Sequence, residues 1–253
     1  MGMQDGLIQL KGRVGNVTFY KTKEGYAARK SSGVDGNKIR NNPSYARTRE
    51  NMAEFQQAMK ATKIFRAAFA DAVKVIGDGG LARRLSSLLS RLLRQDTVNT
   101  RGARLILPIT TGALQGFEFN QSTSLTTLLK IPFTATVERS TGSISVDVPA
   151  FSPKQLVSKP DGATHFILQA TAAELDFAEQ KFISKSAQSP PIGVDDIQQE
   201  AILLANTIPG STKPLFLAFG ISFVQMINGI SYPLKTSHHA VMQVVKVDTG
   251  VTS

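Results

Sequence analysis

Apolar side chains recur every three or four positions between residues 42 and 95, which is the spacing of one face of an α-helix. Asn42 supplies a helix N-cap and Pro43 a first-turn proline, while the glycines around Asp78 end the first helix. The first apolar stripe consists of Met52, Phe55, Met59, Thr62, Phe65, Phe69, Val73 and Ile76, and the second of Leu81, Leu85, Leu88, Leu89, Leu92 and Leu93. The pattern predicts an antiparallel helical hairpin whose two stripes form a core.

After Arg104 the apolar residues alternate with polar ones, which is typical of β-strands. The strand-like runs extend from RLILPIT at residues 104–110 to HAVMQVVKVD at residues 239–248, with Gly- and Pro-containing turns between them. Asn228 and Gly229 lie between two alternating runs, which is the strongest short-range signal of a two-residue β-hairpin. Many short strands at this spacing predict an antiparallel β-sandwich or a closed sheet, and we take the sandwich as the prediction.

The first 41 residues predict short strands followed by a polar loop. VTFYK and GYAARK flank Lys23, Glu24 and Gly25, which would form a three-residue hairpin loop, with Phe19 on one face of the ribbon and Tyr20 on the other. A ribbon of this size is marginal in water and has to pack on something. The fold prediction is therefore an α+β protein: a β-ribbon arm and loop (1–41), a helical hairpin (42–101) and a β-sandwich (102–253).

Charge is distributed unevenly along the chain, whose formal net charge is +10. Residues 1–104 carry 20 basic and 8 acidic side chains, whereas residues 105–253 carry 9 and 11. Such asymmetry points to a polyanionic partner, although solubility alone is the alternative. The predicted partner-binding or nucleic-acid-binding residues are Lys11, Arg13, Lys21, Lys23, Arg29, Lys30, Lys38, Arg40, Arg47 and Arg49, and Arg83, Arg84, Arg91 and Arg94 would add a basic ridge on the second helix.

Signatures of catalysis and cofactor binding are missing from the sequence. It has no P-loop, no GxSxG elbow, no HExxH and no cysteine, so we predict no cofactor and no metal site, and the sequence identifies no small-molecule substrate. His165 lies in an apolar strand, and His238 and His239 would point to opposite faces of one. Glu174 and Asp176 would share a strand face, but nothing else supports a carboxylate pair of the glycosidase type.

Three segments carry a resemblance to a known family: GRVGNVTFYKTKEGY, ARTRENMAEFQQAMKATKIFRAAF and KPLFLAFGISFVQMINGISYPLK. They resemble an uncharacterised family of bacterial proteins common among the Bacteroidetes, and the resemblance spans nearly the whole chain. It implies that this three-part order recurs, and it implies no activity, cofactor or site residue.

The leading hypothesis is a non-enzymatic structural protein that self-assembles into a homo-oligomer, with the basic arm docking on a neighbouring subunit or on nucleic acid. The second is a nucleic-acid-binding protein that grips phosphates through the arm and the arginine ridge. The third is an enzyme of a class that shows no familiar motif. The sequence predicts no signal peptide and no transmembrane segment, which makes the cytoplasm the expected location.

Overall fold

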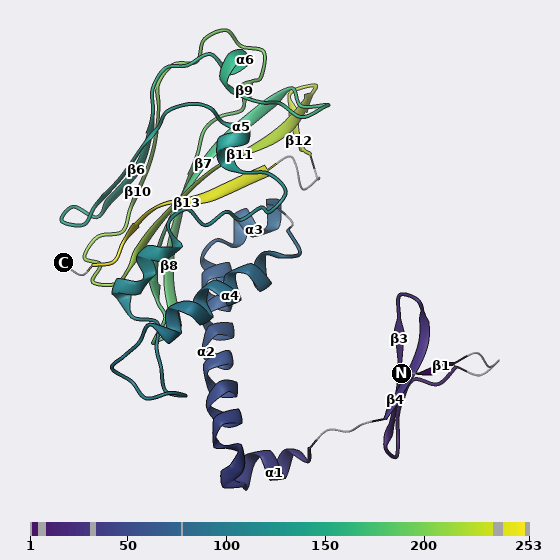
Figure 1. The fold of residues 1–253 in the computed structure, drawn as a ribbon. Coiled ribbons are helices and arrows are strands. Elements are labelled where there is room, and N and C mark those ends of the chain that lie inside the picture. Colours follow the sequence, from purple (N-terminus) through teal and green to yellow (C-terminus); the bar gives the residue numbers. More distant parts are fainter. Residues whose placement is uncertain (1, 5–8, 31–33, 77, 235–239, 251–253) are drawn as a thin grey trace. The chain divides into compact units, whose positions relative to one another are not determined.

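A computed structural model describes residues 2–4, 9–30, 34–76, 78–234 and 240–250 (Figure 1). The chain divides into two compact units, Met1–Glu50 and Asn51–Ser253, and the division falls inside the long helix α2 (Ala46–Ala68). We call them the N-terminal unit and the body and describe each by itself. The α+β class expected from the sequence is confirmed.

The N-terminal unit contains a four-stranded antiparallel sheet in the order β1-β4-β3-β2. Its strands are β1 (Gly2–Met3), β2 (Gly12–Val14), β3 (Val17–Thr22) and β4 (Gly25–Lys30). The predicted hairpin forms, but its loop has two residues instead of three, because Gly25 already pairs with Thr22. The predicted strand LIQL lies partly outside the described residues.

Residues 31–41 were expected to be a loop, and this prediction is wrong for the described part, which contains helix α1 (Gly36–Asn41). The Asp35 carboxylate accepts the Asn37 backbone N–H at 3.1 Å and caps this helix. The Asn42 side chain then accepts the Ser44 N–H at 3.0 Å, opening the 3-10 turn η1 (Pro43–Tyr45) that leads into α2. The predicted Asn-Pro helix start is confirmed.

The body begins with the rest of α2, followed by α3 (Ala70–Ile76) and α4 (Leu81–Arg94). A single non-helical residue, Phe69, separates α2 from α3, and its backbone keeps the helical hydrogen bonds to Phe65 and Val73. The run RLILPIT, predicted as a strand, instead leads into the 3-10 helix η2 (Pro108–Leu114). Helices α5 (Leu125–Leu128) and α6 (Pro153–Leu156) are one turn each.

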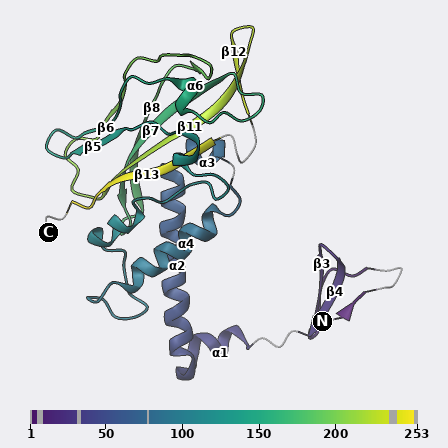
Figure 2. The same ribbon diagram turned by 45° about the horizontal axis from the view of Figure 1, so that its top comes forward.

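Two antiparallel sheets make up the rest of the body (Figures 1 and 2). A three-stranded sheet has the order β10-β6-β5, and a six-stranded sheet has the path β12-β11-β7-β8, with β13 also paired to β11 and β9 to β7. The strands are β5 (Thr134–Glu138), β6 (Ser143–Val148), β7 (His165–Asp176), β8 (Lys181–Gln188), β9 (Ile192–Gly193), β10 (Ile202–Thr207), β11 (Leu215–Ile227), β12 (Ile230–Pro233) and β13 (Ala240–Asp248).

Strand β11 is apolar at nearly every position because both faces of its sheet are covered. Leu217, Phe219 and Ile221 enter one core, which lies against the three-stranded sheet, while the intervening Phe216 and Ala218 enter a second core with the helices. Burial on both faces removes the polar alternation that a half-exposed strand would show. The helices and the six-stranded sheet therefore share one unit.

The predicted Asn-Gly hairpin is confirmed between β11 and β12. Ile227 pairs with Ile230, and the two loop residues have positive φ angles of 51° at Asn228 and 79° at Gly229. These are the left-handed conformations that a tight hairpin needs and that Asn and Gly adopt at low cost.

Only the second half of the first predicted helical stripe is buried. Phe65 and Phe69 are 0% and 1% exposed, whereas Met52, Phe55 and Met59 are 51%, 61% and 41% exposed. The helical core begins at Ala61, and of the earlier residues in the body's part of α2 only Ala58 is fully buried. The second stripe is buried as predicted, except that Leu88 is only partly covered.

Candidate functional site

The candidate site is the set of ten cations of the N-terminal unit. Nine of them are exposed: Lys11, Arg13, Lys21, Lys23, Arg29, Lys30, Lys38, Arg40 and Arg47. The four acids of the unit include Asp35, which caps α1, and Glu50, which pairs with Arg47 at 3.1 Å. The unit has a formal net charge of +6, the difference between ten basic and four acidic residues.

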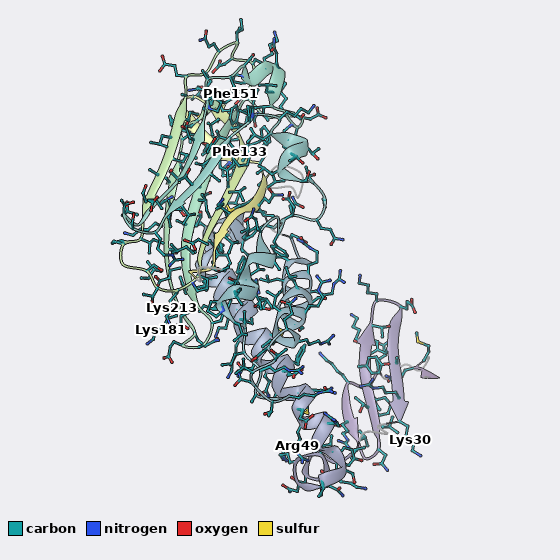
Figure 3. All side chains as sticks on the ribbon, turned by 60° about the vertical axis from the view of Figure 1, so that its left-hand side comes forward. Lys30, Arg49, Phe133, Phe151, Lys181 and Lys213 are labelled. Atoms are coloured by element: carbon teal, nitrogen blue, oxygen red, sulfur yellow. The ribbon has the colours of Figure 1, made fainter. Side chains whose placement is uncertain are left out.

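The tenth cation, Arg49, has a structural role in the same unit. Its Nη1 donates to the backbone carbonyls of Ile39 and Asn42 at 2.8 and 2.9 Å. Carbonyls at the end of a helix have no hydrogen-bond partner within the helix. By donating to two such carbonyls, the Arg49 guanidinium holds the chain between α1 and α2 in place. Lys30 and Arg49 are labelled in Figure 3.

The small sheet presents cations and aromatic rings together on each face. Side chains directly opposite each other in an antiparallel pair lie on one face. One face carries Phe19, Lys21 and Tyr26, with the Lys21 ammonium 5.6 Å from the centre of the Tyr26 ring. The predicted separation of Phe19 from Tyr20 follows from this register.

The opposite face carries two arginines in one row across the strands. Thr18 on β3 pairs with Arg13 on β2 and with Arg29 on β4, which places both guanidinium groups on the face of Thr18. The Arg29 guanidinium lies 5.6 Å from the centre of the Tyr20 ring, within cation–π range. Each face therefore has a cation that can contact an anionic group and an aromatic ring that can contact a flat or apolar group.

The predicted arginine ridge on α4 is interrupted, because Arg84 is largely enclosed. Its guanidinium pairs with Asp78 at 2.6 Å, donates to the carbonyls of Glu118 and Phe119 at 2.8 and 3.0 Å, and lies 5.4 Å from the ring of Phe117. These contacts fix the segment 117–119, which pairs with the edge of β13. Arg84 is thus occupied within the fold, while Arg83, Arg91 and Arg94 are exposed.

Asp176, one of the two carboxylates considered for catalysis, has structural partners. Asp176 accepts the N–H groups of Ala178 and Glu179 and pairs with Lys213 at 2.8 Å, at the turn between β7 and β8 (Figure 3). Burial opposes its charge, but the N–H of Glu179 and the Lys213 ammonium hold the pKa of Asp176 below its ordinary value. His165 contacts Thr164 at 3.0 Å, and His238 and His239 lie outside the described residues.

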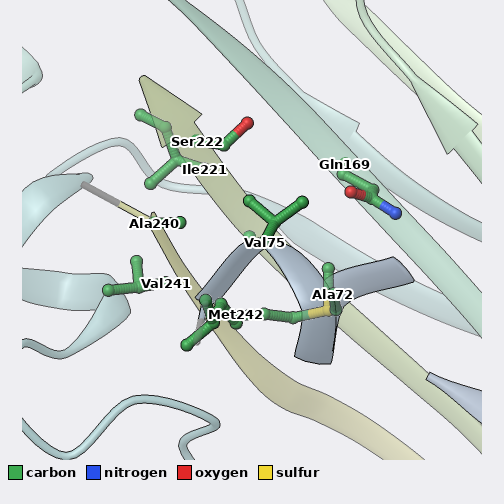
Figure 4. A pocket seen from close by; sticks show the side chains of 10 residues that line it. Ala72, Val75, Gln169, Ile221, Ser222, Ala240, Val241 and Met242 are labelled. Carbon is green, nitrogen blue, oxygen red and sulfur yellow. The ribbon is translucent and has the colours of Figure 1, made fainter. Parts of the chain in front are cut away.

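One hollow of the body lies between α3, β11 and β13 and is lined by Ala72, Val75, Gln169, Ser222 and Met242, among others (Figure 4). Its volume is about 10 Å³, which is room for about one water molecule and excludes an organic substrate. Among the described residues, no group of three or more His, Asp or Glu side chains could hold a metal ion. No helix of the described chain is long and apolar enough to cross a bilayer.

Comparison with known proteins assigns no family. No family model matches the chain, and no curated protein matches it. Among solved structures, a chain from "pH-induced modulation of Streptococcus parasanguinis adhesion by Fap1 fimbriae" aligns with 57% of this chain and 97% of that one, at 12% identity and a TM-score of 0.24. A likeness this weak supports no conclusion about fold or function.

Proposed function

We propose that this chain is a non-enzymatic structural protein that assembles with copies of itself, and that its N-terminal unit docks on a neighbouring subunit. The observation behind the proposal is the small core of that unit. Among its described residues, Ala27 is the only fully buried hydrophobic side chain. A sheet with so little buried apolar area gains little from the hydrophobic effect, and a partner surface would supply the missing burial.

Exposed apolar groups and an incomplete edge suit such docking. Met3, Leu10 and Val14 are 52%, 46% and 66% exposed. On β3, residues 20–22 extend past the pairing with β2, which ends at Phe19. Their outer backbone groups have no strand partner among the described residues, and strand addition would satisfy them with little demand on sequence.

The body of a neighbouring copy has a free strand edge to which β3 could add. β8 ends the six-stranded sheet, and no described strand pairs with its outer side. Its Phe182 and Ile183 are 41% and 49% exposed, so an added strand would cover apolar surface as well as main-chain groups.

Nucleic acid is the second candidate partner, and the mixed faces of the small sheet favour it. Tyr20 with Arg29 and Tyr26 with Lys21 combine rings that can stack on bases with cations that can contact phosphates. The exposed cations of the unit would make such binding strongly dependent on salt.

The two candidates separate in one comparison of charge variants. Lys21, Lys23, Arg29 and Lys30 are replaced by Gln in one variant, and the exposed Lys63, Lys74, Lys130 and Lys154 of the body, none of which lies on β8, in a control that loses the same charge. Mass is measured by light scattering and nucleic acid by the 260/280 ratio, which is sensitive because the chain has four Tyr and no Trp.

Self-assembly predicts a lower mass for the N-terminal variant alone, without nucleic acid in any sample. Nucleic-acid binding predicts that the slope of log affinity against log salt falls by up to ~0.9 for each lost phosphate contact on duplex DNA. Both candidates are refuted if the mass, the affinity for nucleic acid and the dependence of that affinity on salt are the same in both variants and in the parent chain. The charge of the N-terminal unit would then serve solubility.

A further inference from the structure

The side of α2 that points away from the core of the body has an unusual composition. From Met52 onward, the exposed residues of this helix follow one another at steps of one and three positions, so they lie on one continuous face. The buried residues of the same helix, such as Ala61 and Phe65, lie on the opposite side. We call the exposed side the outer face of α2, and it consists of Met52, Phe55, Gln56, Met59, Lys60, Lys63, Arg66 and Ala67.

The first half of the outer face is apolar. Met52, Phe55 and Met59 are 51%, 61% and 41% exposed. They stand three and four positions apart, so their side chains leave adjacent turns on the same side of the helix. Single exposed apolar side chains are normal on a protein surface, whereas a contiguous row of them indicates a surface that contacts something.

The second half of the outer face is cationic and contains no acid. Lys60, Lys63 and Arg66 are exposed and form no hydrogen bond or ion pair with any described residue. Side chains three or four positions apart meet on a helix, and none of these positions around the three cations holds an acid. The cations are instead spaced three residues from one another, where like charges repel. This half therefore needs an anionic partner.

Other parts of the same protein do not match the outer face. A second copy of α2 would bring the same three cations, and the N-terminal unit of a neighbouring copy has a net charge of +6. Nucleic acid would contact the cations and at most the Phe55 ring, and it would leave Met52 and Met59 in water.

The outer face is also small for a protein partner. A helix rises about 1.5 Å per residue and is about 10 Å wide, so the face is ~22 Å long and offers about 220 Å². Each partner in a stable protein complex buries about 800 Å².

The surface of an anionic lipid bilayer matches both halves. Helices that lie in the membrane interface bury apolar side chains where the headgroups meet the acyl chains, and basic side chains beside them contact anionic headgroups. The long stems of Lys and Arg can lie along apolar groups while their charges stay at headgroup level. A fluid surface adapts to a convex helix face and needs no complementary shape.

We propose that the outer face of α2 binds the surface of an anionic membrane. Its three apolar side chains insert where the headgroups meet the acyl chains, and its three cations contact the headgroups. All of these residues belong to the body, so membrane binding does not depend on docking by the N-terminal unit.

The direct test places a fluorescent reporter in the apolar half. The chain has no Trp, so Phe55→Trp in the full chain introduces a single indole. The variant is titrated with vesicles of equal parts phosphatidylglycerol and phosphatidylcholine, with and without bromine on the acyl chains. We expect its emission to shift to the blue and to be quenched by bromine, because the indole enters the acyl-chain boundary.

The matched control is Phe182→Trp, which makes the same exchange at a ring on β8 that is 41% exposed. The cations of the N-terminal unit can also bring the chain to anionic vesicles, and binding through them alone leaves both indoles away from bromine. We therefore expect Phe182→Trp to keep its emission while the chain sediments with the vesicles.

Sedimentation with the same vesicles measures how much each half contributes. One cation near an anionic surface strengthens binding about fivefold, so replacing all three cations of the outer face by Gln should weaken it about a hundredfold. Phe55→Ser should weaken it about tenfold or more, the loss of one inserted ring. A control in which the exposed Lys130, Lys154 and Lys246 become Gln should stay within about fivefold of the parent chain. Thermal melts check that every variant is folded.

Four results overturn the proposal: an emission of Phe55→Trp that is neither shifted nor quenched, equal quenching of the two indoles, equal losses in the two charge variants, or equal binding to vesicles of phosphatidylcholine alone. A duplex oligonucleotide that binds through the three cations, with no binding to vesicles, also overturns it and identifies nucleic acid as the partner. The mass measurements above are made without lipid, so the two proposals fail separately.

Discussion

Replacing Phe65 by Ala tests the position of the helical core. The Phe65 side chain is 0% exposed, and its ring centre lies 4.9–6.2 Å from those of Phe69, Phe117, Phe119 and Phe216. Phe69 lies between α2 and α3, Phe117 and Phe119 lie in the segment that pairs with the edge of β13, and Phe216 lies on β11. Phe65 thus joins the helices to the six-stranded sheet at one point.

The expected loss follows from the buried area and the cavity left behind. A buried Phe removes about 150–250 Å² from water, worth ~4–6 kcal/mol at ~25 cal/mol per Å², of which Ala keeps a small part. Measured Phe→Ala substitutions in cores cost about 3–5 kcal/mol. We expect about 4 kcal/mol, and for a domain of this size that is a fall in Tm of about 8–16 °C.

The assay is urea denaturation followed by far-UV circular dichroism, because the chain has no Trp to report by fluorescence. Phe55→Ala is the matched control, since it removes the same ring from the same helix at a position that is 61% exposed. It should cost less than about 1 kcal/mol, as surface substitutions do. Equal losses at the two positions, or a loss below about 1 kcal/mol at Phe65, would refute this assignment of the core.

Three further outcomes are expected. Deleting residues 1–41 should leave a body with a cooperative melt, because both cores lie beyond that segment; a broad, non-cooperative melt would show that it belongs to the core. Burial raises the pKa of Glu118 in the folded chain above its value in the unfolded chain, so the parent loses folding stability as pH rises from the unfolded-state pKa through the folded-state pKa. In urea melts, the stability of Glu118→Gln relative to the parent should therefore increase between pH 4 and 7. A difference that stays constant over this range would contradict the prediction. A Cβ at Gly220 would clash with the Val241 carbonyl oxygen, so Gly220→Ala should cost at least about 1–3 kcal/mol, whereas Gly79→Ala, with open space around it, should melt near the parent Tm.

The sequence predicted the strands best where apolar alternation and turn chemistry agreed. The Asn228 and Gly229 hairpin is the clearest case, because both residues tolerate the positive φ that the loop requires. RLILPIT failed because a short apolar run fits a strand and a 3-10 turn equally well, and Pro108 starts the latter. The helix at residues 36–41 was missed because its Asp35 cap stands in a Gly-rich, polar context that also suits a loop.

Other features depend on contacts between distant segments, which periodicity does not contain. The stripe on α2 shows which side of the helix is apolar, but not that Met52, Phe55 and Met59 stay exposed while the helical core begins at Ala61. Arg84 and Arg49 look like surface cations in the sequence, and their carbonyl partners become visible only in the fold.

The central claim is that the N-terminal unit carries the contact between copies. Light scattering of the nucleic-acid-free chain and of the same chain lacking residues 1–41 tests it most directly. The account predicts that the full chain has a mass that is a multiple of 27.3 kDa and rises with concentration, while the shortened chain stays at a single-copy mass. A full chain that remains at 27.3 kDa over the whole concentration range, or a shortened chain that keeps the multiple, would contradict it.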